Sequence, residues 1–194
     1  MIRSKVIRLS NVGCSIGEDG WCEQAIRLGS PNFNARPIPD DISLLVIHNI
    51  SLPVGQFGGA SIAKLFQNCL DYSEHESFES LRDVKVSSHF LIRRDGALLQ
   101  FVSTLDRAWH AGVSFFNGRE ACNDFSIGIE LEGTDDLPFE QTQYDSLGLL
   151  TLTLLNRFAI THIVGHDEIA PGRKTDPGPC FDWALYEQQI GRRA

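Results

Sequence analysis

A short apolar run that ends in a histidine constrains the fold of this chain more than any other feature. Residues 44–48 have the sequence LLVIH, in which branched apolar side chains follow one another without a polar break. Such a run is typical of a strand buried on both faces, and these strands lie inside sheets that other elements cover. We therefore expect a covered sheet with this strand inside it and His48 at the strand's end.

Other segments also have strand patterns. Residues 88–93 and 97–102 flank Asp95-Gly96, and Asp-Gly between two apolar segments is a hairpin signal. Residues 126–131 alternate Ile and Leu with Ser, Gly and Glu, and residues 160–164 form another short apolar strand.

Helix patterns lie between these strands. Residues 61–70 predict a short helix with Ser61 as its N-cap, and residues 140–158 predict the longest helix of the chain. A last helix begins after Asp182, which we expect to cap it. Because strands and helices are interleaved, the sequence predicts an α/β fold with a mixed central β-sheet flanked by helices.

The length of the chain fits one domain. At 194 residues it lies near the upper end of a single compact unit, and no segment has the composition of a linker. We expect one domain over residues 1–194, in which residues 1–40 are largely irregular apart from a short strand at residues 6–9.

Charge and composition exclude several classes of protein. The formal net charge of −8 argues against a nucleic-acid-binding protein and against electrostatic adhesion to anionic membranes. Residues 1–17 contain no apolar run of signal-peptide length, and no stretch is long enough to span a bilayer. The five cysteines, without a CxxC pair, predict buried free thiols, and we expect a cytoplasmic protein. Nothing in the sequence indicates an obligate protein partner.

Two histidines and one aspartate make a candidate metal site. His48 and His166 each follow an apolar strand, and Asp176 comes ten residues after His166. Two imidazoles and one carboxylate form a common open zinc set, which leaves a fourth position for water. A hydrogen-bonded structural histidine is the ordinary alternative for a single His at a strand end, and spacing alone does not show that these residues meet.

The other histidines compete for the ligand role. His75 lies in a polar, exposed stretch, and His162 alternates with apolar residues and fits either face of its strand. His89 and His110 lie in richer surroundings, SSHFLIRRDG and RAWHAGVS. Trp109 either lines a site beside His110 or packs in the core.

Charged residues near these histidines allow acid–base chemistry. Glu130 and Glu132 lie two apart on one strand and share a face, so one could be a general base while the other is solvated. Arg173 and Lys174 precede Asp176 and could stabilise an oxyanion or bind a carboxylate. Both cations are otherwise ordinary loop charges.

Taken together, long segments of the chain resemble the AmpD-type N-acetylmuramoyl-L-alanine amidases. The segments are HNISLP, FGG, SSHFLIRRDG, RAWHAGVS, CNDFSIGIELEGT and GHDEIAPGRKTDPGPCFDW, which follow one another in order over residues 20–183. This family is related to phage-lysozyme amidases and peptidoglycan recognition proteins. The resemblance implies their fold, a mixed sheet with helices on its faces.

The resemblance also implies the site. It assigns one zinc ion per chain to His48, His166 and Asp176, with Glu130, rather than Glu132, and Lys174 as catalytic residues. Ala121 stands where the family has an arginine near the peptide carboxylates, and Lys85 also replaces an arginine. The implied substrate contacts are Asn49, Trp109, His110, Arg119 and Lys85.

The implied activity is hydrolysis of the amide bond between 1,6-anhydro-N-acetylmuramic acid and L-alanine in small muropeptides during cell-wall recycling. An amidase for intact peptidoglycan outside the cytoplasm is one alternative. A peptidoglycan-binding module without activity is another, but such relatives lack a metal ligand, and here the whole implied set is present. A structural protein without activity is the remaining alternative.

Overall fold

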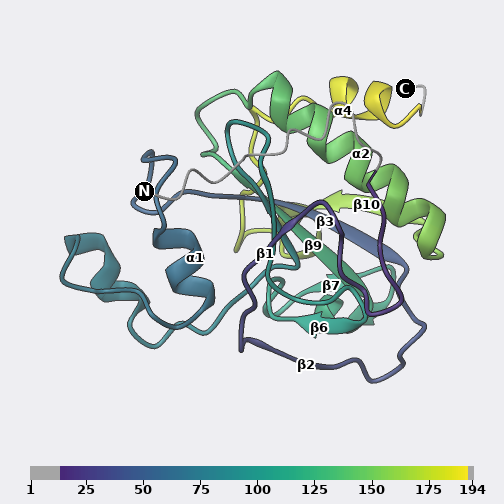
Figure 1. The fold of residues 1–194 in the computed structure, drawn as a ribbon, viewed down its shortest axis with the longest axis horizontal. Helices are drawn as coiled ribbons and strands as arrows, with labels where there is room; N and C mark the ends of the chain where they lie inside the picture. The colour runs from purple at the N-terminus through teal and green to yellow at the C-terminus, as the bar shows by residue number, and fades with distance from the viewer. Residues whose placement is uncertain (1–13, 192–194) are drawn as a thin grey trace.

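The structure is a computed structural model that describes residues 14–191, and its centre is a six-stranded mixed sheet (Figure 1). Most neighbouring strands run parallel, and β4 and β5 form the antiparallel hairpin predicted around Asp95-Gly96. The predicted mixed sheet is therefore confirmed. In spatial order the strands are β1 (Ile26–Arg27), β5 (Leu98–Gln100), β4 (Phe90–Ile92), β9 (Ser126–Glu132), β3 (Leu44–Ile50) and β10 (His162–Gly165).

Helices α2 (Gln141–Arg157) and α4 (Trp183–Gln189) cover one face of this sheet (Figure 1). Leu147, Leu150 and Leu154 of α2 pack in one core cluster with strand residues such as Ile47 and Ile129. Both helices were predicted. The predicted cap of α4 is also confirmed, because the Asp182 carboxylate accepts a hydrogen bond from the backbone N–H of Leu185 at 2.9 Å.

The opposite face of the sheet has two smaller apolar clusters, and the gap between them is where polar side chains gather. In one cluster, α1 (Ser61–Phe66) and the 3-10 helix η2 (Glu76–Leu81) cover Leu91 and Leu99. In the other, Ile169 of α3 (His166–Ile169) and Phe125 cover Leu44 and Val46. Short elements frame this face: β2 (Phe33–Ala35), β6 (Asp106–Ala108), β7 (Phe115–Phe116), β8 (Arg119–Glu120) and the 3-10 helix η3 (Cys122–Asp124).

Some local predictions differ from the structure. Helix α1 ends at Phe66 rather than residue 70, because Asn68 adopts a positive φ of 56° that ends the helical path. Its N-cap is Ala60, without a side-chain hydrogen bond, so Ser61 is the first helical residue and not the cap. The strand expected at residues 6–9 lies outside the described residues.

The prediction of buried thiols is correct for some cysteines only. All five are free, but Cys69 is exposed and Cys14 and Cys180 are half-buried. Cys69 follows the end of α1, and the neighbouring Leu70 is the side chain that packs in the core there.

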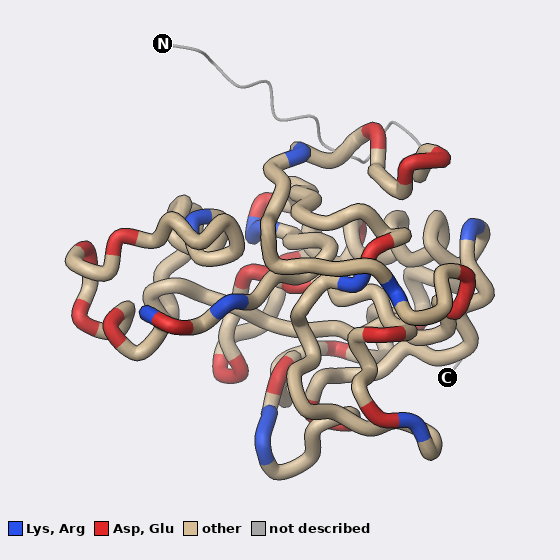
Figure 2. The backbone as a smooth tube through the Cα atoms, turned by 90° about the horizontal axis from the view of Figure 1, so that it is seen from below, with Lys and Arg blue, Asp and Glu red and all other residues tan. Residues whose placement is uncertain are grey.

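Charged residues are dispersed over the fold. In Figure 2, Lys and Arg positions and Asp and Glu positions are both scattered over the backbone, and neither kind gathers on one side. Within residues 14–191, no helix has the length and apolar character needed to cross a membrane.

Candidate metal centre

The register between two parallel strands places His48 beside Glu130. Strand β3 pairs with β9 so that His48 lies opposite Glu130, two residue pairs before the ladder ends at Ile50 and Glu132. Alternate residues of a strand point to the same face. Ile47 and Ile129 lie in the cluster under α2, so His48 and Glu130 point to the other face, into the gap between its two apolar clusters.

Strand β10 positions the second histidine, His166. It pairs in parallel with β3, with Gly165 opposite Ile47, and His166 follows directly as the first residue of α3. The loop after α3 then returns to this point, because the N–H of Asp167 donates to the carbonyl of Asp176 at 3.0 Å. His166 and Asp176 therefore converge at the carboxyl end of β3.

The three side chains form a tight triangle. His48 Nδ1, His166 Nδ1 and Asp176 Oδ2 lie 3.0 Å from one another in each of the three pairs. A tetrahedral zinc ion with bonds of about 2.0–2.1 Å holds its ligand atoms only slightly further apart, at about 3.3 Å. The triangle thus fits a small metal ion, and among the described residues it is the one such group of three His, Cys, Asp or Glu side chains.

The protonation states also suit metal binding. Burial lowers the pKa of His48 to about 4, so its imidazole is neutral at pH 7, the form that binds metals. Burial works against ionisation of Asp176, but its close contacts with the ring nitrogens of His166 and His48 outweigh burial and hold its pKa below the usual range. The centre therefore offers a neutral imidazole at His48 and an ionised carboxylate at Asp176.

Hydrogen bonds on the far side of each imidazole fix its orientation. His166 Nε2 donates to the carbonyl of Ala111 at 3.1 Å, which leaves Nδ1 free to face the centre. His48 Nε2 lies 2.9 Å from His110 Nδ1, and His110 Nε2 lies 3.0 Å from Ser126 Oγ. If His48 donates to His110 and His110 donates to Ser126, each of these ring nitrogens has a hydrogen-bond partner. His48 Nδ1 then remains as a ligand atom.

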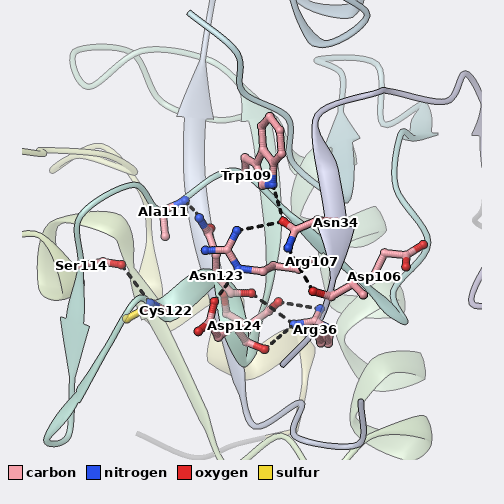
Figure 3. Close-up of polar contacts among 12 residues, drawn as sticks. Asn34, Arg36, Asp106, Arg107, Trp109, Ala111, Ser114, Cys122, Asn123 and Asp124 are labelled. Atoms are coloured by element: carbon pink, nitrogen blue, oxygen red, sulfur yellow. Dashed lines mark hydrogen bonds and ion pairs between the residues drawn. The ribbon is translucent and has the colours of Figure 1, made fainter. Parts of the chain in front are cut away.

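The loop that carries His110 is held by Asn123, as Figure 3 shows for its neighbour Ala111. Asn123 Oδ1 accepts hydrogen bonds from the backbone N–H groups of His110 at 3.1 Å and Ala111 at 2.8 Å. Because His110 and Ala111 in turn contact the two histidines of the triangle, Asn123 positions both of them indirectly.

A buried arginine that the sequence analysis did not single out anchors this region (Figure 3). Arg36 is 5% exposed, and its guanidinium donates to the carbonyls of Asn123, Asp124, Thr104 and Ser126. It ties the N-terminal segment to η3 and to the start of β9. No local sequence pattern distinguishes Arg36, because all four acceptors are backbone atoms far along the chain.

The two glutamates of β9 have different environments. Glu130 is 8% exposed, and its Oε2 is buried without a hydrogen-bond partner among the described residues. Burial, and next the charge of Asp176, raise the pKa of Glu130 well above its ordinary value. Glu132 instead accepts hydrogen bonds from the N–H of Gly58 at 2.6 Å and of Arg94 at 3.2 Å. Glu130 therefore keeps one buried oxygen without a partner among the described residues, while Glu132 holds two loops.

Some predicted substrate-contact residues lie near the triangle. Asn49 follows His48 and donates to Asp135 Oδ1 at 2.6 Å and to the carbonyl of Pro177 at 3.0 Å. Trp109 is half-buried beside His110, and its Nε1 donates to Asn34 Oδ1 at 2.7 Å (Figure 3).

The predicted cations differ in their placement. Arg119 pairs with Asp41 and lies over the Phe125 ring at 3.6 Å, at the opposite end of β3 from His48. Lys85 is exposed between η2 and β4. Lys174 is exposed on the loop that carries Asp176, and its charge acts on both His48 and Glu130.

A hollow of about 630 Å³ lies between chain segments that follow His110 and His166. It is lined by residues 112–115, by Glu120 and Ala121, by residues 169–171 and by Arg173. The Arg173 guanidinium bridges the carbonyls of Ala111 and Val113 at 2.8 and 2.6 Å. Since the carbonyl of Ala111 also accepts from His166, it links the lining residue Arg173 to the triangle.

Comparison with known proteins identifies the family. The family model described as N-acetylmuramoyl-L-alanine amidase matches residues 38–179, which include every residue of the triangle. The chain belongs to this amidase family. The 1,6-anhydro-N-acetylmuramyl-L-alanine amidase AmpD of Citrobacter freundii is 51% identical over 175 residues, which cover 89% of this chain and 94% of that protein.

Solved structures of amidases agree with this membership. A crystal structure of a selenomethionine derivative of AmpD has a TM-score of 0.88 at 51% identity, over 89% of this chain and 98% of that one. The Escherichia coli amidase AmiD, solved with anhydro-N-acetylmuramic acid-L-Ala-D-γ-Glu-L-Lys as substrate, has a TM-score of 0.59 at 30% identity, over 94% and 67%. The predicted amidase fold is thereby confirmed.

Proposed function

We propose that this amidase hydrolyses the bond between 1,6-anhydro-N-acetylmuramic acid and L-alanine in small muropeptides, a reaction of cell-wall recycling. The relatives that match nearly the whole chain at about half identity are named for this reaction. The observation that carries the proposal is the triangle of His48, His166 and Asp176 next to a buried carboxylate with one unpaired oxygen.

The ion that we assign to the triangle is one zinc per chain. Two imidazole nitrogens are borderline-soft ligands, which favour zinc over magnesium or calcium. When bound, zinc lowers the pKa of a coordinated water to about 7 and polarises a carbonyl group. The side chain of Asp176 is 14% exposed, whereas those of His48 and His166 are 1% and 3% exposed, so substrate would approach from the side of Asp176.

Glu130 acts as the general base in this proposal. It accepts a proton from the attacking water through its unpaired Oε2 and then delivers it to the departing alanine nitrogen. Its raised pKa makes the carboxylate a stronger base than an exposed glutamate. General acid–base catalysis of this kind typically contributes about 10²–10⁴ in rate.

Lys174 serves as the second catalytic residue in this proposal. Its ammonium stabilises the negative charge that develops on the substrate carbonyl oxygen. Lys174 is exposed, so it can move toward bound substrate without losing a contact that buries it.

The remaining residues would bind the substrate. Asn49 and Trp109 border the centre, and we assign the peptide part of the muropeptide to the hollow of about 630 Å³. Contacts from His110, Arg119 and Lys85 stay predictions of the sequence, and both ring nitrogens of His110 already have protein partners. A cytoplasmic location is also proposed, since five free thiols suit a reducing compartment.

Mass spectrometry of an anhydromuramyl tripeptide incubated with the protein tests this function. We expect release of the free tripeptide, its loss when a chelator is added, and its recovery with zinc. Intact sacculi serve as a second substrate, and faster release from sacculi would favour the alternative of a peptidoglycan-degrading amidase.

Two matched glutamine variants test the general base. Glu130→Gln should retain one zinc per chain by elemental analysis and lose at least about a hundredfold in rate. Glu132→Gln should keep its rate within about tenfold and lose about 1–3 kcal/mol of stability, because one of its two backbone donors loses its acceptor. Full activity in Glu130→Gln together with an inactive Glu132→Gln would reverse the assignment.

A further inference from the structure

Two cysteines far from the metal centre lie in contact. The sulfur atoms of Cys14 and Cys22 are 3.0 Å apart, about 1 Å more than the length of a disulfide bond. Cys22 is 4% exposed and belongs to the core cluster under α2, and Cys14 packs against that cluster while remaining partly exposed.

The backbone holds both residues in place. Ile16 forms an antiparallel bridge with Cys22, and the N–H of Glu23 donates to the carbonyl of Ser15 at 3.1 Å. The N–H of Cys22 donates to Gln100 Oε1 of β5 at 2.6 Å, and the carbonyl of Cys14 accepts from Thr153 of α2 at 3.4 Å. The fold therefore brings the two thiols together from both sides of the turn between them.

The surroundings make one sulfur the nucleophile. The hydrogen bond from Cys14, followed by backbone N–H groups of Gln24, Ala25 and Ser15, lowers the pKa of Cys22 to about 7 against the opposing effect of burial. The same hydrogen bond, and then burial, raise the pKa of Cys14. Cys22 is thus the sulfur that is partly ionised at neutral pH, and the thiolate is the reactive form.

A metal site is the other common use of paired cysteines. Within residues 14–191, these two thiols do not belong to a group of three His, Cys, Asp or Glu side chains that could share an ion. Cys22 Sγ also lies 3.7 Å from an amide oxygen, Gln24 Oε1. Amide oxygens suit hard cations and not a thiolate-bound soft metal. The geometry therefore favours thiol oxidation.

We propose that Cys14 and Cys22 are an oxidation site at which hydrogen peroxide forms an intramolecular disulfide bond in the folded protein. The bond would close the turn between them, whose two ends are hydrogen-bonded to Gln100 of β5 and Thr153 of α2. This inference does not depend on the proposed amidase reaction.

The two steps balance with peroxide as the oxidant. The Cys22 thiolate attacks one peroxide oxygen, the O–O bond breaks, and the products are the Cys22 sulfenic acid and hydroxide, which takes up a proton to become water. Cys14 sulfur then attacks Cys22 sulfur, the S–O bond breaks, and the leaving hydroxide takes the Cys14 proton. In sum, two thiols lose two electrons and two protons, and peroxide becomes two molecules of water.

Peptide mapping tests the proposal directly. Trypsin should release residues 9–27 as one peptide that contains both cysteines, because no Lys or Arg lies between Arg8 and Arg27. The whole protein is treated with peroxide, quenched in acid, unfolded and alkylated with iodoacetamide. We expect this peptide to carry no alkyl group and to lack two hydrogens, and to carry two alkyl groups after treatment with dithiothreitol.

Controls separate this reaction from nonspecific oxidation. Cys69→Ser removes the exposed thiol and should leave the linked peptide unchanged, whereas Cys14→Ser should abolish it. The linked peptide should form at least about tenfold faster in the folded protein than in urea, because the fold holds the sulfurs together. Equal rates in both states, or two alkyl groups on the peptide while Cys69 is oxidised, would overturn the proposal.

Discussion

A single methyl group added to β9 should lower the metal affinity of the centre by displacing a side chain that contacts His48. A Cβ atom at Gly128 would lie 2.5 Å from both Cγ and Nδ1 of His110. Ordinary carbon contacts are about 3.5–4.0 Å, so the Gly128→Ala variant must displace the His110 ring by about 1 Å. The hydrogen bond of 2.9 Å between His110 Nδ1 and His48 Nε2 would then exceed the usual limit.

The expected magnitude follows from the loss of this bond. Removing a hydrogen bond behind a metal-binding histidine typically lowers metal affinity about 10–100-fold. Overpacking a filled site costs a further 1–3 kcal/mol, roughly, in the free energy of unfolding. We expect both effects in Gly128→Ala, measured by competition for zinc with a fluorescent chelator and by urea unfolding.

Two further variants make this prediction refutable. Gly59→Ala is the matched control, because the nearest atom to its Cβ is 4.0 Å away, and it should change zinc affinity less than twofold. In a His110→Ala background the clash partner is gone, so adding Gly128→Ala should cost little more. Zinc affinity of Gly128→Ala within a factor of two of the unmodified protein would refute the reasoning.

Three further predictions concern residues around the centre and in the core. Asn123→Ala leaves two backbone N–H groups without their acceptor, and urea unfolding should show a loss of about 2–6 kcal/mol, from about 1–3 per group; an unchanged midpoint would contradict this. Burial, and next the Arg36 charge, lower the pKa of His89 to about 3. Below about pH 6.5, His89 therefore binds a proton in the unfolded chain but not in the folded protein. Stability should therefore fall between pH 7 and pH 5, by about 2 kcal/mol for each such histidine, and His89→Gln should reduce this slope. Leu154→Ala, at a fully buried position, should lower the free energy of unfolding by about 2–5 kcal/mol without changing zinc binding. This result would show that the core under α2 contributes to stability and not to metal binding.

Local sequence patterns were sufficient to predict most elements of the fold. The apolar run that ends at His48, the Asp95-Gly96 turn and the period of α2 depend on neighbouring residues, and the structure contains each of them. The extent of α1 was overestimated, because the positive φ at Asn68 ends the helix while the apolar pattern continues. Intrinsic patterns do not report such a local turn.

The spacing of residues along the sequence could not predict the metal centre. The meeting of His48 and His166 depends on the parallel pairing of β3 and β10, a contact between distant segments that only resemblance to a family could indicate. His110 is positioned by its contact with Asn123, and Arg36 is positioned by its hydrogen bonds to backbone carbonyls. Neither arrangement has a sequence signature. For the same reason, the sequence could not separate Glu130 from Glu132 by residue type alone.

The pairing of His48 with Glu130 also determines where the chain can change length. One residue inserted in β9 ahead of Glu130 would turn that carboxylate toward Leu147 and Leu150 of α2, so the reaction would fail even in a chain that still folds. An extra residue in the loop before α2 leaves this alternation intact. Variation in length among working versions of this enzyme should therefore be confined to the loops, while β3 and β9 keep a fixed number of residues up to the reacting pair.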